Sequence, residues 1–195
     1  MPQIETARLR LRMFTFGDLD DYHRQIFSDP AVMKYLPPGT SVPKEKTRSA
    51  LGNILAHWEH YGFGLWAVAH KPLGQLIGHC GLQTLQNTGE VELAYGLAQA
   101  LWGQGLATEA AKACVRFGFE ELRLERIVAI AKAEHIASQR VMIKVGMKYE
   151  KNARFYNLDV VYYAISRSTY QPDGSLYVLR DDSLGRVTPQ ERGRA

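Results

Sequence analysis

The sequence predicts an α/β (α+β) domain built on one mixed, mostly antiparallel sheet with helices on both faces. Apolar runs at 63–69, 76–85 and 90–97, separated by turn residues, predict an antiparallel meander. A strand, a helix and a second strand then follow across residues 90–132. A helical crossover places the second strand parallel to the first, so one parallel pair is expected. A hairpin at 147–168 is expected to add two antiparallel strands.

Ahead of this sheet the chain predicts one strand and three helical segments. Residues 8–13 alternate arginine with apolar side chains, which is typical of a strand with one solvated face. A helix is expected at 18–27 with Asp18 as its N-cap. The pair Asp29–Pro30 predicts a short helical turn. Residues 43–60 then carry apolar side chains at helical spacing.

The second half of the chain completes the expected fold. An amphipathic helix is predicted at 106–122, and a short buried strand at 126–132. A second helix is expected at 138–145, because Gly146 follows it as a C-terminal stop. The final hairpin turns at Tyr156–Asn157.

Length and composition indicate one main domain. The chain has 195 residues, of which 46% are apolar and 23% are charged, so it can bury a sizeable core. We expect a domain at 1–170 and a C-terminal extension at 171–195 that is partly packed or loose. Within the extension, 176–179 predict either an extra strand or a packed segment, and the end from about residue 189 is expected to be loose.

The sequence also indicates a cytoplasmic protein. It has no apolar run near the ~20 residues of a membrane span, and no apolar core of a secretory signal. Its two cysteines, Cys80 and Cys114, form no CxxC pair and are too few for a disulfide framework. We therefore expect two buried thiols in a reducing compartment, no membrane partner and no metal site.

The positive charge is concentrated in one region. Formal net charge is +4, and residues 112–154 hold ten Lys or Arg against five Glu. Such a region suits a phosphorylated cofactor or a nucleic acid, because either binds a basic patch. No nucleic-acid motif or interleaving of aromatic with basic residues supports the second partner, so nucleic-acid binding is the less favoured interpretation.

A glycine-rich segment at 101–110 follows the acidic strand at 90–97 and opens a helix. A helix start carries unpaired N–H groups and the positive end of the helix dipole, and glycine lets a ligand approach the backbone. The segment therefore predicts a phosphate cradle. Its G-x-G-x-A spacing matches neither the nucleotide-triphosphate loop nor the dinucleotide turn. The alternative is an ordinary helix start in which the glycines serve packing.

Three ordered segments together resemble the GNAT acetyltransferases, in the branch that contains the ribosomal-protein N-terminal (RimJ/RimL-like) acetyltransferases. The resemblance covers roughly residues 4–168. The segments are Thr6-Ala7-Arg8-Leu9-Arg10-Leu11-Arg12 with Gly17-Asp18-Leu19, Glu92 to Leu97 ahead of Leu101 to Ala110, and Ala137-Ser138-Gln139-Arg140-Val141 with Val145-Gly146-Met147.

This resemblance implies a GNAT-like sheet whose parallel strands splay apart to admit acetyl-CoA (coenzyme A). Backbone N–H groups of the glycine-rich loop would hold the pyrophosphate, so the side chain of Gln104 is expected to matter little. Trp102 stands where the family usually has Gln or Arg, and His135 where it usually has Asn. The implied cofactor-binding residues are Tyr95, Gly96, Leu97, Trp102, Gly103, Gln104, Gly105, Leu106, Ala107, Thr108, His135 and Ser138.

Acetyl transfer requires a base for the amine and an acid for the leaving thiolate. We predict Glu92 as the base, with Glu90 on the same strand face as the alternative; either could instead be a solvated glutamate. By resemblance, Ser138 is the predicted acid, and its alternative role is an N-cap hydroxyl. Tyr149 and Tyr156 are weaker candidates for the acid. Glu109, in the first turn of the helix, is favoured as a helix-stabilising acid.

The predicted function is therefore an N-acetyltransferase acting on a primary amine, either a protein N-terminus or a small molecule. The alternatives are a non-catalytic acyl-CoA-binding regulatory module and a nucleic-acid-associated protein. We expect the acceptor pocket between residues 28–62 and the final hairpin; four aromatic residues could line it or belong to the core. They are Trp58, Tyr61, Phe63 and Trp66. A homodimer is a candidate assembly, since dimers are common for the fold that the chain resembles; no residue pattern indicates the oligomeric state.

Overall fold

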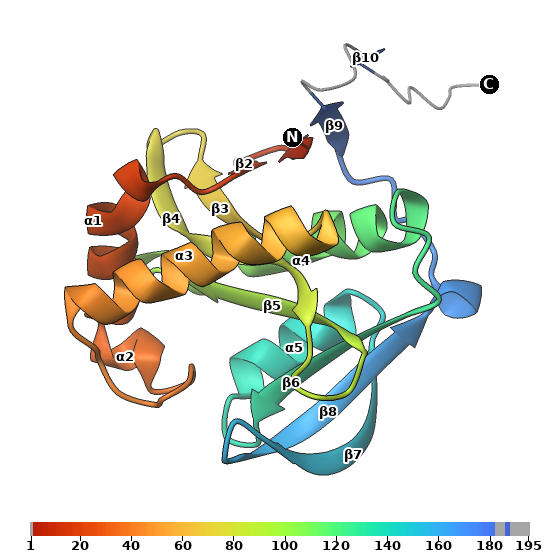
Figure 1. Ribbon diagram of the computed structural model, residues 1–195. Coiled ribbons are helices and arrows are strands. Elements are labelled where there is room, and N and C mark those ends of the chain that lie inside the picture. Colours follow the sequence, from red (N-terminus) through yellow and green to blue (C-terminus); the bar gives the residue numbers. More distant parts are fainter. Residues whose placement is uncertain (1, 182–185, 188–195) are drawn as a thin grey trace.

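The computed structural model describes residues 2–181 and 186–187, and the expected loose end from residue 189 lies outside these. In this part of the chain the strands form one ten-stranded sheet, in the order β10-β9-β1-β2-β3-β4-β5-β6-β8-β7 (Figure 1). The strands are β1 (Pro2–Glu5), β2 (Leu9–Arg12), β3 (Leu65–His70), β4 (Gln75–Thr84), β5 (Val91–Leu97), β6 (Arg126–Lys132), β7 (Lys148–Phe155), β8 (Leu158–Ser166), β9 (Val178–Asp181) and β10 (Arg186–Val187).

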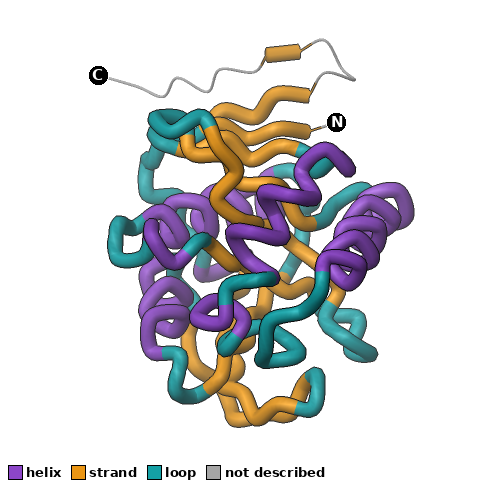
Figure 2. Tube along the Cα trace, turned by 90° about the vertical axis from the view of Figure 1, so that its left-hand side faces the viewer, coloured by secondary structure: helices purple, strands orange, loops and turns teal. Residues whose placement is uncertain are grey.

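Every neighbouring pair in this sheet is antiparallel except β5 and β6, which run parallel. Helix α4 (Leu106–Glu120) makes the crossover between these two strands. The predicted mixed sheet with one parallel pair is thus confirmed. Figure 2 shows helices on both sides of the strands, with the N-terminal strands at one end of the sheet.

The helices cover the sheet in two groups. On one face lie α1 (Leu19–Tyr22), the π-helical turn η2 (His23–Phe27), α2 (Pro30–Met33) and α3 (Lys44–Tyr61), packed over a core that includes Ala67 and Leu76. On the other face α4 packs with α5 (Ile136–Lys144) over the larger core. Three short 3-10 turns complete the helical segments, η1 (Phe16–Asp18), η3 (Gln99–Leu101) and η4 (Arg167–Thr169).

The segment predicted as a helix at 18–27 is helical throughout but changes helix type along its length, and helix α5 starts earlier than predicted. Asp18 stands at the N-cap position of α1, as predicted, but its side chain makes no capping hydrogen bond to that helix. Its carboxylate instead accepts hydrogen bonds from Arg12 at 2.6 and 2.9 Å and from the Thr15 backbone at 2.8 Å. The segment runs without a gap through η1, α1 and η2 to Phe27. Helix α5 begins at Ile136, two residues before the predicted start, which places Ser138 inside its first turn.

Burial in the core identifies the roles of two predicted pocket tryptophans and of both cysteines. Trp58 and Trp66 are buried, and their indole N–H groups donate to the carbonyls of Leu65 and Pro2. They are core residues and do not line an acceptor pocket. Both cysteines are fully buried as predicted, with their sulfur atoms 3.4 Å apart.

In the extension, strand β9 pairs with β1, so a strand forms at Val178–Asp181.

Candidate active site

The parallel strands β5 and β6 separate soon after they meet. Strand β5 pairs with β4 at seven positions, whereas its single recorded pair with β6 joins Glu92 and Val128. Beyond that point β5 continues to Leu97 and β6 to Lys132 without another recorded pair. The splayed pair opens the sheet between these strand ends, and two adjoining cavities lie there.

One cavity, of about 320 Å³, lies between the end of β5, the start of α4 and helix α5. Eleven of the twelve predicted cofactor-binding residues line it. Gln104 does not; its backbone carbonyl instead accepts a hydrogen bond from Arg8 at 2.9 Å. The eleven are Tyr95, Gly96, Leu97, Trp102, Gly103, Gly105, Leu106, Ala107, Thr108, His135 and Ser138.

The start of α4 fits an anionic group. Gly103 and Gly105 have φ angles of 77° and 78°, a left-handed conformation that disfavours other residues. Gly105 is the N-cap residue and no side chain caps the helix. The first internal hydrogen bond runs from Glu109 N–H to Gly105 O at 3.0 Å, so the N–H groups of the first turn remain available. Such a helix start binds phosphate through its N–H groups and dipole.

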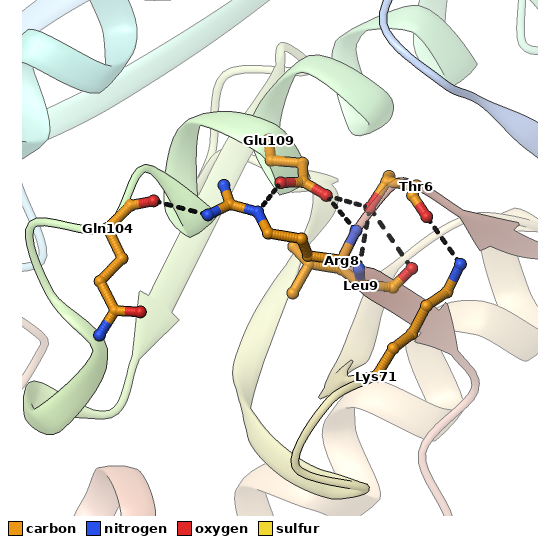
Figure 3. Close-up of polar contacts among 6 residues, drawn as sticks. All are labelled: Thr6, Arg8, Leu9, Lys71, Gln104 and Glu109. Atoms are coloured by element: carbon orange, nitrogen blue, oxygen red, sulfur yellow. Dashed lines mark hydrogen bonds and ion pairs between the residues drawn. The ribbon is translucent and has the colours of Figure 1, made fainter.

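Glu109 ties this helix to the N-terminal strands (Figure 3). Its carboxylate accepts hydrogen bonds from the Thr6 hydroxyl at 2.6 Å and from the Arg8 backbone and side chain at 2.8 and 2.7 Å. Burial alone would raise the pKa of Glu109, but these hydrogen bonds lower it overall. Arg8 therefore joins the first turn of α4 to the carbonyl of Gln104, a link that sequence analysis missed. Glu109 stabilises this junction and does not face either cavity of the splayed pair.

The second cavity, of about 430 Å³, lies on the α3 side of the sheet. It shares five lining residues with the first, so the two are continuous at the splayed pair. The shared residues are Tyr35, Leu36, Tyr95, His135 and Ser138. Of the predicted pocket aromatics, Tyr61 and Phe63 do not line this cavity; they contact His57 beside it. The final hairpin does contribute, through Phe155, Tyr156, Leu158 and Val160.

Strand β5 presents different chemistry to each side, because successive side chains of a strand point to opposite faces. Leu93 and Leu97 belong to the core beneath α4, and Tyr95 packs against it. A side chain at Gly96 would point the other way, towards His79 and Leu36. Glu92 shares the Gly96 face, so Glu92 and Tyr95 approach the opening from opposite sides.

Glu92 is 5% exposed and lines the second cavity. Burial raises the pKa of its carboxyl to about 7, although a 3.0 Å hydrogen bond donated by the Gln83 amide partly lowers it. Glu90 differs in both respects. It lies outside the cavity, accepts a hydrogen bond from Tyr162 and pairs with Arg126 at 3.4 Å. The structure thus places Glu92, and not Glu90, where a base could meet a ligand.

Ser138 and Tyr95 form a hydroxyl pair at the junction of the cavities. Their side-chain oxygens are 2.9 Å apart, and the Tyr95 hydroxyl also lies 3.0 Å from the Ser138 carbonyl. Ser138 is inside the first turn of α5 and does not occupy the N-cap, which is His135. Of the weaker candidates, Tyr149 bonds Asn152 outside both cavities, whereas Tyr156 lines the second one.

His135 lines both cavities and stacks on Tyr35, with ring centroids 3.7 Å apart and planes at 9°. Burial lowers the pKa of His135, so its neutral form is favoured. Tyr35 follows α2, and the stack therefore joins α2 to the start of α5. Within the described residues, the His135 side chain does not cap α5 with a hydrogen bond.

A buried pair, His79 and Tyr22, was missed by sequence analysis. The Tyr22 hydroxyl lies 3.0 Å from His79 Nδ1, and both side chains line the second cavity. Burial lowers the pKa of His79 to about 4, so the imidazole is neutral at pH 7. A Cβ at Gly96 would stand 2.7 Å from the His79 ring. Gly96 therefore has a packing reason for being glycine, in addition to lining the cofactor cavity.

The described residues contain neither a metal-ligand cluster nor a membrane-spanning helix. Within residues 2–181 and 186–187, no three His, Cys, Asp or Glu side chains are grouped so that they could hold a metal ion. In the same residues, no helix has the length and apolar character needed to cross a bilayer.

The fold and site define an acyltransferase of the GNAT class, and comparison with known proteins agrees. The acetyltransferase (GNAT) domain family matches residues 8–148. The uncharacterized protein YkkB of Bacillus subtilis (strain 168) is 33% identical over 163 residues, covering 83% of this chain and 94% of YkkB. This chain therefore belongs to the GNAT acetyltransferases, an enzyme family that takes its acetyl group from acetyl-CoA.

Solved structures share the fold. The crystal structure of a GNAT-family acetyltransferase from Bacillus anthracis superimposes with a TM-score of 0.73 and 30% identity, covering 85% of this chain and 99% of that one. RimL, described as a ribosomal L7/L12 alpha-N-protein acetyltransferase in complex with coenzyme A, gives a TM-score of 0.71 at 16% identity. The two chains are covered to 83% and 95%. At that identity the likeness to RimL establishes the fold alone.

Proposed function

We propose that this protein transfers the acetyl group of acetyl-CoA directly to a primary amine, with Glu92 as the base. The observation that carries the proposal is a buried carboxyl with a pKa of about 7 at the opening between the splayed strands. A base is most effective when its pKa lies near the working pH. The solvated-glutamate alternative is inconsistent with 5% exposure.

The cofactor cavity fits the donor. Unpaired N–H groups at the start of α4 would hold the pyrophosphate, and the opening beyond Glu92 would admit the pantetheine arm. The RimL structure, which has the same fold, is a complex with coenzyme A, and this supports coenzyme A as the ligand. When bound, acetyl-CoA supplies an acetyl group activated as a thioester. Arg140 and Lys144, which also line this cavity, add positive charge beside the phosphates.

The proton steps then divide between the two sides of β5. Glu92 accepts a proton from the substrate ammonium, and the free amine attacks the thioester carbonyl from the α3 side. Ser138 donates its hydroxyl proton to the leaving sulfur as the C–S bond breaks, and the Tyr95 hydroxyl at 2.9 Å can return a proton to Ser138. The second proton that the amine nitrogen loses as the amide forms then restores this hydroxyl pair. Holding both reactants in line supplies much of the rate acceleration.

Kinetics of Glu92→Gln tests this proposal against the regulatory-module alternative. We expect acetylation at pH 8 to fall by about 10²–10⁴-fold, the usual contribution of general base catalysis. Affinity for coenzyme A, measured by calorimetry, should stay within about threefold because Glu92 does not line the cofactor cavity. The acetylation rate of the wild type should rise as pH passes about 7, and the rate of the variant should not show this rise. Unchanged turnover in the variant would remove Glu92 from the mechanism.

Four further expectations belong to the same proposal. The acceptor is either a protein N-terminus or a small-molecule amine, the protein is cytoplasmic, and it forms a homodimer. Residues 1–170 are proposed as the catalytic domain. Strand β9 of the extension covers the edge of β1, so a chain cut after residue 170 should expose that edge.

A further inference from the structure

The acceptor cavity is apolar over most of its wall. It is lined by the aromatic rings of Tyr22, Phe27, Tyr35, Phe155 and Tyr156 and by several aliphatic side chains. Its volume of about 430 Å³ lies towards the lower end of the ~300–1,000 Å³ range of small-molecule sites. The cavity therefore suits a compact, largely apolar molecule with one polar end.

Negative charge is scarce in this cavity. Among the described residues that line it, Glu92 is the one carboxylate. The imidazoles of His79 and His135 have lowered pKa values because they are buried, so they add no charge of either sign at pH 7. One ammonium group therefore finds a carboxylate partner at Glu92, and a second ammonium does not.

A positively charged side chain, that of Lys132, lines another part of the acceptor cavity. Lys132, at the end of β6, lines the cavity and donates a 2.8 Å hydrogen bond from Nζ to the carbonyl of Lys34 after α2. This bond links the splayed strand to the segment between α2 and α3. A substrate with a second cationic group would meet the Lys132 ammonium and would be repelled by it.

We propose that the acceptor is a small monoamine with an apolar or aromatic body and no second cationic group. The inference rests on the proposed function and names the substrate class of the same site. It disfavours polyamines and aminoglycosides, which carry several ammonium groups. It also favours a free small molecule over a protein N-terminus, because the cavity is small and Lys132 spans one side of it.

A matched pair of amines tests the charge argument. Hexylamine and 1,6-diaminohexane have the same carbon chain and differ in the second ammonium group. With the full chain and saturating acetyl-CoA, release of free thiol should give a kcat/KM for hexylamine at least about tenfold above that for the diamine. 2-Phenylethylamine should match or exceed hexylamine, and a tetrapeptide with a free N-terminus should fall below both.

The variant Lys132→Met should reduce the ratio between hexylamine and the diamine severalfold, because it removes the repelling charge. Lys148→Met is the matched control, since Lys148 lies on β7 outside the cavity lining, and it should leave the ratio unchanged. Equal or better use of the diamine by the wild-type protein, a preference for the peptide, or an unchanged ratio in Lys132→Met would each overturn the inference. The first two of these results would leave the proposed acetyltransferase standing; no turnover of any amine would overturn both.

Discussion

Replacing Glu92 by Gln should make the folded protein more stable at alkaline pH while it removes the proposed base. The buried Glu92 carboxyl binds its proton more tightly in the folded state, where its pKa is about 7, than in the unfolded chain, where the ordinary value is 4.5. Ionisation therefore favours unfolding. Stability contributed by the protonated carboxyl is complete below pH 4.5 and is lost as pH rises through about 7.

The size of the effect follows from these two pKa values. One pKa unit corresponds to 1.36 kcal/mol, so the difference between 4.5 and about 7 corresponds to a penalty of about 3 kcal/mol above pH 7. Glutamine has nearly the same shape, remains uncharged and can still accept the hydrogen bond from the Gln83 amide. Glu92→Gln should therefore gain up to about 3 kcal/mol at pH 8 and little at pH 4.5.

Urea denaturation at pH 5, 6, 7 and 8 measures this difference directly. The difference in the free energy of unfolding between the variant and the wild type should increase with pH and reach a plateau above pH 7. Glu90→Gln is the matched control, because Glu90 is partly exposed and paired with Arg126 and should not gain stability in this way. If Glu92→Gln were no more stable than wild type at pH 8, the buried-base argument would be refuted.

Three other substitutions test separate parts of the site. Tyr95→Phe removes the hydroxyl 2.9 Å from Ser138 and should lower kcat about 10–100-fold with little change in coenzyme A affinity; an unaltered kcat would exclude a role for this hydroxyl. Arg8→Met breaks the link between Glu109 and Gln104 and should weaken coenzyme A binding about tenfold in calorimetry. It should spare kcat/KM for phosphate-free S-acetylpantetheine, and Arg10→Met serves as its control; equal losses for both donors would argue against loop positioning. Gly96→Ala places a Cβ 2.7 Å from the His79 ring and should destabilise the fold by about 1–3 kcal/mol in urea; a neutral result would show that the ring can move freely.

Local patterns were enough to predict most of the elements. The strand at 126–132 and the helix that opens after Gly105 depend on apolar spacing and glycine placement, which are properties of neighbouring residues. The order of strand, helix and strand then dictated the parallel pair. At 18–27 the spacing predicted the helical segment and its end at Phe27, but not the bonds of Asp18 to Arg12 and Thr15, because the choice between a cap and an ion pair is not visible in spacing.

Contacts between distant residues could not be predicted in the same way. The sequence showed Glu90 and Glu92 as equivalent positions on one strand face. Only the fold shows that Arg126 and Tyr162 engage Glu90 while Glu92 remains buried beside Gln83. Their roles separate because residues brought together by the fold change the desolvation and hydrogen bonding of each carboxyl.

The same strand explains why this arrangement suits transfer between two substrates. Glu92 and Tyr95 are three positions apart on β5, so the pleat directs them to opposite faces of the sheet. In a fully paired sheet such groups could not act on one ligand, because the backbone would separate them. Strands β5 and β6 pair at Glu92 and Val128 and then diverge, and the two cavities join just beyond that position. An acetyl group held in the opening would therefore lie between a base on the amine side and hydroxyl groups on the thioester side.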